Sequence, residues 1–204
     1  MRRPPAKRLL DLVGASVLLL LLSPIVLVVL TASALDALFA PQDRGSLLYR
    51  ERRISRGRRF DLLKFRTLRA DMLARATGHA RLLEADPANL TWLGRRLLKP
   101  WYLDEIPQLW NVLRGDISLV GPRPWPPQLV DAQRAEGVTY RDEVAAGLTG
   151  LAQLTKGSEQ RYADLDLAYI ERCRRLGNWA LVRYDLEILV RTVGVIARGQ
   201  GLSN

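Results

Sequence analysis

The chain has 204 residues, with 31 lysines and arginines against 21 aspartates and glutamates, and a formal net charge of +10. This length suits one domain with a modest core, and the basic excess indicates anionic partners. A single cysteine (Cys173) excludes an internal disulfide. With a single histidine (His79) and no CxxC, GxGxxG or GxxxxGKS pattern, it also argues against zinc, dinucleotide and Walker-type NTPase sites.

The first predicted element is an uncharged apolar segment from Leu12 to Leu35. As a helix it would be roughly 36 Å long, enough to cross a bilayer. Ser23 and Pro24 lie near its middle, and a proline there removes a hydrogen bond and kinks a helix. Both flanks are basic, which by the positive-inside rule puts both ends on the cytoplasmic side. We therefore expect a helix that enters and returns on one face, with a kinked transmembrane helix as the alternative.

An arginine-rich run follows, in which six of the ten residues from Arg50 to Arg59 are arginine. Such a run could bind nucleic acid, but the neighbouring apolar anchor favours anionic lipid headgroups instead. Phe60 to Phe65 is a short predicted strand, bounded by basic residues. A predicted helix from Leu68 to Ala85 is ended by Asp86-Pro87.

The stretch from Leu103 to Pro127 holds the densest pattern in the chain. Its apolar residues recur at intervals of three and four, which predicts a helix that begins near Leu103 and is closed by Gly115. Pro107 would then lie in the first turn, where a proline is tolerated. The residues that set this spacing are Leu103, Ile106, Leu109, Trp110 and Leu113.

Two adjacent carboxylates, Asp104 and Glu105, open this predicted helix. At the N-cap, Asp104 would accept backbone hydrogen bonds and feel the helix dipole, so we expect its ionised, nucleophilic form to be favoured. Glu105, roughly 100° away around the helix, would be free to hold a cation. Mg²⁺ suits an all-oxygen site of this kind. The alternative is that Asp104 is only a cap and Glu105 only a solvated acid.

Two further residues and one amphipathic stretch follow as candidates for function. Arg123 lies between two prolines and is therefore held on a stiff turn. Asp166 lies on a predicted helix, where it is either functional or part of the polar face. The amphipathic stretch from Trp179 to Arg198 either lies in a membrane interface or packs on the core. The predicted fold class is mainly α with a little β.

Six blocks in order resemble the bacterial sugar transferase family, the monotopic polyprenyl-phosphate phosphoglycosyl transferases, over nearly the whole chain. They are KRLLDL, the Ser-Pro of the apolar segment, RERRISRGRRFDLLKFRTL, LDEIPQLWNVLRGDISLVGPRP, AGLTGLAQ and DLDLAYI. The resemblance implies a re-entrant (broken) membrane helix in residues 1–40 and a compact catalytic domain with interfacial amphipathic helices in residues 41–204.

The implied reaction moves a phospho-sugar from a UDP-sugar to polyprenyl (undecaprenyl) phosphate and releases UMP. It would be the first membrane step of glycoconjugate, exopolysaccharide or O-antigen synthesis. It would take place on the cytoplasmic face of the bacterial inner membrane, with Mg²⁺ as the cofactor. Asp104 would be the nucleophile of a covalent intermediate, and Glu105 would hold the metal. The other residues that match family positions are Lys64, Lys99, Arg123 and Asp166 for phosphate or substrate, and Lys7, Arg8, Ser23 and Pro24 for the membrane anchor.

The sequence departs from the family pattern at two places. Lys99 stands where the family commonly has an arginine, and it offers a point charge without the bidentate fork. It is followed by Pro100, Trp101 and Tyr102 instead of small polar residues. Ala146-Gly147 replaces the usual Pro-Gly ahead of Thr149.

Two other functions fit parts of the sequence. A membrane-anchored basic adaptor would use the arginine run to bind acidic lipid or nucleic acid without catalysis, but it would have no use for Asp104 and Glu105. A phosphohydrolase would keep the site and replace the lipid acceptor with water. The sequence does not identify the sugar, the prenol, the polymer or the oligomeric state.

Overall fold

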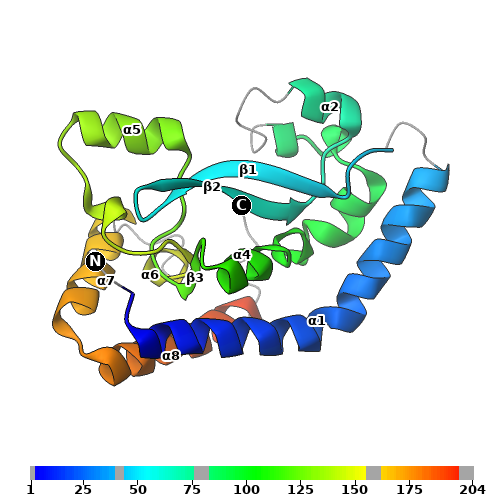
Figure 1. Ribbon diagram of the computed structural model, residues 1–204. Helices are drawn as coiled ribbons and strands as arrows, with labels where there is room; N and C mark the ends of the chain where they lie inside the picture. The colour runs from blue at the N-terminus through cyan, green and yellow to red at the C-terminus, as the bar shows by residue number, and fades with distance from the viewer. Residues whose placement is uncertain (1–2, 40–43, 76–82, 155–161, 198–204) are drawn as a thin grey trace. The chain divides into compact units, whose positions relative to one another are not determined.

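The computed structural model describes residues 3–39, 44–75, 83–154 and 162–197. Helices dominate these residues, and their strands form two small sheets of two strands each, which confirms the predicted class of mainly α with a little β (Figure 1). The elements are α1 (Pro5–Phe39), β1 (Leu48–Ser55), β2 (Arg58–Phe65), α2 (Ala70–Arg75), α4 (Gln108–Arg114), β3 (Ser118–Val120), α5 (Pro127–Ala135), β4 (Gly147–Thr149), α6 (Leu151–Leu154), α7 (Tyr162–Arg175) and α8 (Asn178–Ala197).

The chain divides into two compact units. The first unit contains Met1–Val17, Arg52–Asp61 and Leu109–Asn204, and the second contains Leu18–Glu51 and Leu62–Gln108. The predicted division into a membrane helix (residues 1–40) and a catalytic domain (residues 41–204) stays a prediction.

Helix α1 continues through Ser23 and Pro24 as one helix, and Figure 1 shows a bend within it; its return to the same membrane face stays a prediction. Pro24 has no N–H to donate to the carbonyl of Leu20, four residues earlier. The Ser23 hydroxyl donates to that carbonyl instead, at 2.7 Å. The Ser-Pro pair therefore bends the helix while keeping its carbonyl satisfied, as an apolar surrounding requires.

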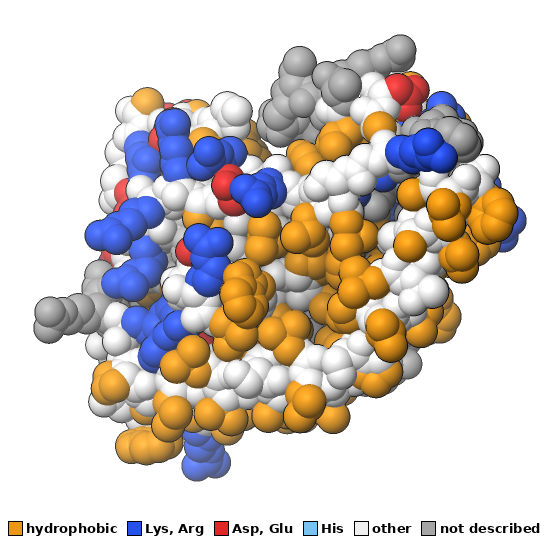
Figure 2. Space-filling model, turned by 45° about the vertical axis from the view of Figure 1, so that its right-hand side comes forward, with side chains coloured by type: hydrophobic (Ala, Val, Ile, Leu, Met, Phe, Trp, Pro, Cys, Tyr) orange, Lys and Arg blue, Asp and Glu red, His pale blue; other side chains and the backbone are white. Residues whose placement is uncertain are grey.

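The apolar side chains of α1 are mostly exposed, as the orange side chains along it in Figure 2 show. By length and composition α1 could cross a membrane, and only 11% of its most apolar stretch is buried within the protein. A helix with an apolar surface on nearly all sides is typical of a lipid environment.

The basic residues at the start of α1 bind protein groups. Lys7 is 5% exposed, forms an ion pair with Asp185 of α8, and donates at 3.0 Å each to the Tyr169 hydroxyl and the Val120 carbonyl. Arg8 donates to two carbonyls in the last turn of α4, at 2.7 and 2.6 Å. The predicted anchor residues Lys7 and Arg8 thus fasten α1 to the first unit, rather than presenting their charges to lipid.

The core of the first unit surrounds a parallel pair of strands. Ser118 of β3 is in register with Gly147 of β4, and helix α8 contacts both strands. A Cβ atom on Gly147 would lie 2.1 Å from the backbone nitrogen of Gly121, so this close approach requires glycine. The buried apolar residues include Ile117, Leu119, Val120, Val130, Ile170, Leu181 and Ile188.

Strands β1 and β2 form a hairpin, which confirms the strand predicted from Phe60 to Phe65 and extends it back to Arg58. Its turn is Arg56-Gly57, with φ of 51° and 73°. Two consecutive positive φ angles match the right-handed twist of a tight hairpin.

The helix predicted from Leu68 to Ala85 is only partly observed. Leu68 forms an isolated bridge with Leu90, and α2 begins at Ala70. Residues 76–82 of that prediction lie outside the described residues. The core of the second unit includes Leu62, Phe65, Leu68, Leu93, Leu98 and Ile106.

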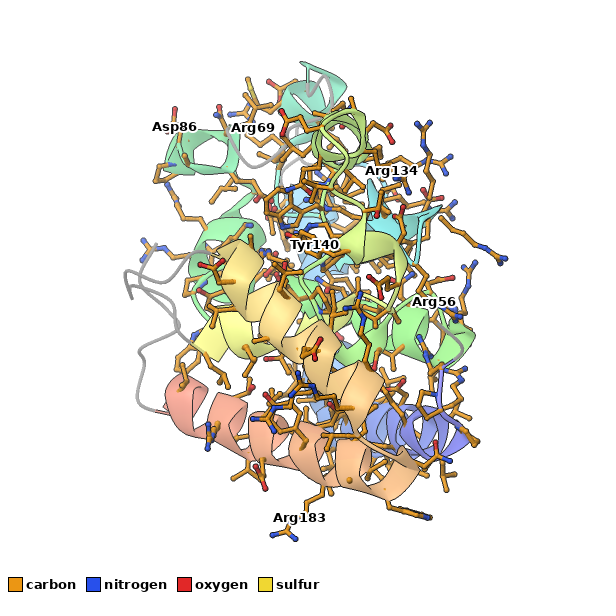
Figure 3. The ribbon with its side chains drawn as sticks, turned by 90° about the vertical axis from the view of Figure 1, so that its left-hand side faces the viewer. Arg56, Arg69, Asp86, Arg134, Tyr140 and Arg183 are labelled. Atoms are coloured by element: carbon orange, nitrogen blue, oxygen red, sulfur yellow. The ribbon has the colours of Figure 1, made fainter. Side chains whose placement is uncertain are left out.

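The predicted helix from Trp179 to Arg198 is confirmed as α8 (Asn178–Ala197), and Arg198 lies outside the described residues. Its buried side carries Leu181, Asp185 and Ile188, whereas the apolar residues Val190 and Val193 are 72% and 67% exposed. Arg183 points away from the protein (Figure 3). Val190 and Val193 therefore do not pack on the core, because they lie on the opposite side of α8 from Leu181, Asp185 and Ile188.

Candidate active site

Asp104 lies in a short 3₁₀ turn, Leu103–Glu105, and not in a long helix. The helix predicted from Leu103 is wrong at its start, since α4 begins at Gln108, and correct at its end, since Gly115 follows α4 with a φ of 88°. Pro107 has no N–H to donate to the Leu103 carbonyl, which accepts from Ile106 at 3.2 Å instead. The proline therefore tightens the turn that carries Asp104.

Burial controls the protonation of Asp104. The residue is 3% exposed, and its nearest charged partner is Lys99, whose Nζ lies 3.5 Å from Oδ2. Burial raises the pKa of Asp104 to about 6, against the opposing charges of Lys99 and Lys64. The expectation that a helix N-terminus favours the ionised form is wrong, because loss of solvation outweighs the stabilisation.

Lys99 joins Asp104 to a second carboxylate, the half-buried Glu84. Its Nζ lies 2.5 Å from Glu84 Oε2, while the Thr67 hydroxyl donates to Oε1 at 2.8 Å. Burial opposes the charged form of Glu84, but Lys99 and Thr67 keep its pKa below the usual value. Burial also opposes the charge of Lys99, and Asp104 and Glu84 raise its pKa nevertheless. Lys99 is thus a shared cation between two carboxylates.

Lys64 is also held by a carboxylate. It lies on β2, 3.4 Å from Glu51 of β1, and its side chain is only 15% exposed. It is close enough to Asp104 to lower the pKa of that carboxyl. The structure thus brings Lys64, Lys99 and Asp104 together in the second unit, with half-buried Glu105 beside Asp104.

Arg123 and Asp166 belong to the first unit. The Arg123 side chain is exposed, whereas its backbone carbonyl accepts from Arg141 at 3.1 Å. Asp166 is 3% exposed, and its Oδ2 accepts from Arg141 at 2.6 Å. Burial raises the pKa of Asp166 to about 6, although the charge of Arg141 lowers it. Both predicted residues therefore contact Arg141.

The sequence analysis missed Glu84 and Arg141. Each is bonded to a predicted site residue, Glu84 to Lys99 and Arg141 to Asp166. Both are charged residues in stretches with no strong pattern, and their partners lie 15 and 25 positions away. Burial is what distinguishes them from surface charges, and residue spacing alone does not report it.

The model of the family described as bacterial sugar transferase matches residues 2–199. The chain is 34% identical to a UDP-galactose-lipid carrier transferase of Erwinia amylovora, an alignment that covers 96% of this chain and 41% of that protein. It therefore spans less than half the length of that relative.

Two other relatives align over most of their own length. One is the exopolysaccharide production protein ExoY of Rhizobium meliloti, 35% identical, with 96% of this chain and 87% of that protein covered. The other is a UDP-glucose:undecaprenyl-phosphate glucose-1-phosphate transferase of Caulobacter vibrioides, 37% identical, with 92% and 68% covered.

Proposed function

Because the chain belongs to the bacterial sugar transferase family, we propose that it transfers a phospho-sugar from a UDP-sugar to polyprenyl phosphate. The products are polyprenyl-diphosphate sugar and UMP. Relatives named for undecaprenyl phosphate, a lipid carrier and exopolysaccharide production support this choice of donor, acceptor and pathway class.

The reaction proceeds in two displacements at one phosphorus. A carboxylate oxygen of Asp104 attacks the sugar-linked phosphorus, and the bond from that phosphorus to the bridging oxygen breaks. UMP leaves with the bridging oxygen and its electron pair. A phosphate oxygen of the polyprenyl phosphate then attacks the same phosphorus and releases Asp104. Covalent catalysis of this kind splits one difficult transfer into two easier ones.

The pairing of buried Asp104 with half-buried Lys99 is the observation that carries this proposal. A pKa of about 6 leaves most of Asp104 ionised near pH 7, yet burial keeps the carboxylate poorly solvated. Lys99 stabilises the charge and limits the directions the carboxylate can take. A charge held by protein groups instead of water needs little solvent rearrangement before it attacks.

Mg²⁺ fits the acidic pair only with help from the substrate. The described residues include no group of three or more potential metal ligands. Mg²⁺ is commonly held by one or two carboxylates together with substrate phosphates and water, and Glu105 beside Asp104 meets that need. When bound there, the metal would neutralise charge on the diphosphate.

Of the basic residues predicted to bind phosphate, Arg123 is exposed, whereas Lys64 and Lys99 are paired with carboxylates. The exposed guanidinium of Arg123 can bind two phosphate oxygens at once, which suits it to the diphosphate of the donor. Lys64 and Lys99 are paired with carboxylates and act on the charge of Asp104. Family resemblance suggested phosphate binding by both lysines, and their ion pairs favour this electrostatic role.

We place the enzyme on the cytoplasmic face of the bacterial inner membrane, with α1 inserted as a re-entrant helix. The exposed apolar surface of α1 and its Ser23-Pro24 bend support this arrangement. The exposed apolar residues of α8 would lie at the lipid headgroup boundary.

Release of UMP tests the function. Full-length protein in detergent would be given Mg²⁺, undecaprenyl phosphate and a panel of UDP-sugars. We expect lipid-dependent UMP release with at least one donor, and its loss in Asp104→Asn. UMP and free sugar phosphate without the lipid would indicate a phosphohydrolase. No release from folded protein with any donor would favour the adaptor function.

A further inference from the structure

The prolines of the turn that presents Arg123 stiffen its backbone, but they leave it with few N–H donors. Its sequence is Pro122-Arg123-Pro124-Trp125-Pro126, and the three prolines have no backbone N–H to donate. Arg123 and Trp125 have the two backbone N–H groups of this segment, so few hydrogen bonds can form within it. Its conformation therefore depends on bonds that its carbonyls accept from elsewhere.

Three carbonyls of this turn accept from three separate segments. The carbonyl of Pro122 accepts from the Gly147 backbone at 2.8 Å, and that of Trp125 accepts from the Ile54 backbone at 3.0 Å. Between them, the carbonyl of Arg123 accepts from the Arg141 side chain at 3.1 Å. Arg141 is thus the side-chain support at the residue that bears the exposed guanidinium.

Arg141 is itself held on several sides. Its guanidinium carbon lies 4.0 Å from the Trp125 ring centre and 5.1 Å from that of Tyr140, the residue labelled in Figure 3. Its Nη2 donates to the Tyr140 hydroxyl at 3.1 Å and to Asp166 at 2.6 Å. The Arg141 and Asp166 side chains are 6% and 4% exposed. A buried arginine needs such a partner, because an unpaired buried charge is costly.

Asp166 is badly suited to bind phosphate directly. An ionised carboxylate only accepts hydrogen bonds, so it offers no donor to a phosphate oxygen. Its charge would also repel the donor diphosphate. Its bond to Arg141 gives it a different function.

We infer that Arg141 and Asp166 are positioning residues, which form a buried strut that holds the Arg123 turn in its diphosphate-binding conformation. This inference rests on the proposed function, in which Arg123 binds the diphosphate. It replaces a direct phosphate contact by Asp166 with an action through two other residues. It also assigns a role to Arg141, which no sequence pattern had singled out.

A double-mutant cycle on UMP release tests the strut. Asp166→Asn and Arg141→Gln should each lower kcat/KM about ten- to hundredfold, the range expected when a charge-assisted hydrogen bond is lost. In an Arg123→Ala background the same changes should cost less than about twofold more, because the side chain they position is gone. The inference would be overturned if these changes lowered kcat/KM as much in the Arg123→Ala background as in wild type. It would also be overturned if the single variants kept a kcat/KM within about twofold of wild type.

Two further variants separate positioning from general damage. Arg141→Lys keeps the positive charge, but a single ammonium group cannot bond both the Arg123 carbonyl and Asp166 as the guanidinium does. Its kcat/KM should therefore be as low as that of Arg141→Gln. Arg174→Gln is the matched control, because Arg174 of α7 pairs with Glu143 and does not contact the Arg123 turn. It should retain wild-type kcat/KM, and a loss as large as that of Asp166→Asn would refute a specific strut.

Hydrogen exchange provides a readout that needs no substrate. The amides of Gly147 and Ile54, which donate to the Pro122 and Trp125 carbonyls of the turn, should exchange faster in Asp166→Asn and Arg141→Gln than in wild type or Arg174→Gln. Unchanged exchange would refute the strut, even for a protein active in UMP release. Absence of UMP release in wild type would refute the proposed function instead, and exchange alone would then decide whether the strut holds the turn.

Discussion

At the residue scale, the environment of Asp104, the proposed nucleophile, lowers the stability of the fold at neutral pH. Its side chain is almost fully buried, and its pKa rises from 3.8 to about 6. Above pH 6 the folded protein must hold a charge that the unfolded chain holds more easily in water. Asp104, the proposed nucleophile, is therefore a destabilising residue at neutral pH, a trade-off common at active sites.

Asp104→Asn should accordingly stabilise the fold while it abolishes UMP release. A shift of about two pKa units corresponds to about 3 kcal/mol, or roughly 6–12 °C in melting temperature for a chain of this size. The gain should be complete above pH 6 and should disappear below pH 3.8, where Asp104 is neutral in both the folded and the unfolded protein.

Thermal unfolding in detergent without divalent cations, from pH 4 to pH 8, measures this difference. Glu136→Gln alters an exposed carboxylate and should leave the melting temperature unchanged. If Asp104→Asn melted below wild type at pH 8, the account of a desolvated nucleophile would be wrong.

The sequence predicted which residues lie in the candidate site better than it predicted how buried they are. Asp104, Lys64 and Lys99 lie together, as the family pattern implied. The protonation of Asp104 could not be predicted, because its pKa depends on burial by residues distant in sequence. The partners Glu84 and Arg141 were missed for the same reason.

At the scale of elements, proline explains both the correct and the incorrect predictions. Pro24 was expected to disturb α1, and the helix bends while the Ser23 hydroxyl satisfies the freed Leu20 carbonyl. Pro107 was expected inside a helix, and α4 instead begins after it. Sequence spacing identifies an apolar face well, but it does not show where backbone hydrogen bonds begin.

The bend leads to a prediction about topology. Pro24→Ala restores the N–H that donates to Leu20, so α1 should straighten and cross the bilayer. Tags before α1 and after Asn204 should both be cytoplasmic in wild type and should lie on opposite sides in Pro24→Ala. Protease or thiol-reagent access to the tags in intact and opened cells measures this.

Ser33→Ala is the matched control, since Ser33 makes the same kind of bond, to the Val29 carbonyl at 2.8 Å, with no proline beside it. It should keep the wild-type topology. Opposite sides already in wild type would mean that α1 spans the membrane.

The start of α1 supplies a second prediction at this scale. Lys7→Met leaves Asp185 fully buried without its cation, and loss of one partner of a buried pair costs about 3–5 kcal/mol. Lys7→Met with Asp185→Asn should recover much of that loss, because Asn keeps an acceptor for Tyr169.

Urea unfolding in detergent measures these free energies. Arg183→Gln, which alters an exposed pair on the same helix α8, should change stability by less than about 0.5 kcal/mol. A loss in Lys7→Met no larger than in Arg183→Gln would contradict the anchoring of α1 through Asp185.

For the whole molecule, the sequence predicted the class and the family, and the structure adds how charge is distributed. The net charge of +10 indicated anionic partners, yet Lys7, Lys64, Lys99 and Arg141 are bonded inside the protein. Arg123 is exposed and remains suited to a diphosphate. The net charge alone could not separate basic residues paired inside the protein from exposed ones, because it counts every lysine and arginine equally.

The central claim is that Asp104 becomes covalently bound to the phospho-sugar. Intact-protein mass spectrometry after incubation with Mg²⁺ and an active UDP-sugar, without polyprenyl phosphate, tests it most directly. We expect a mass increase of one phospho-sugar, located by peptide mapping to Asp104, absent in Asp104→Asn and removed by adding polyprenyl phosphate. Lipid-dependent UMP release with no adduct, or an adduct on another residue, would contradict the account.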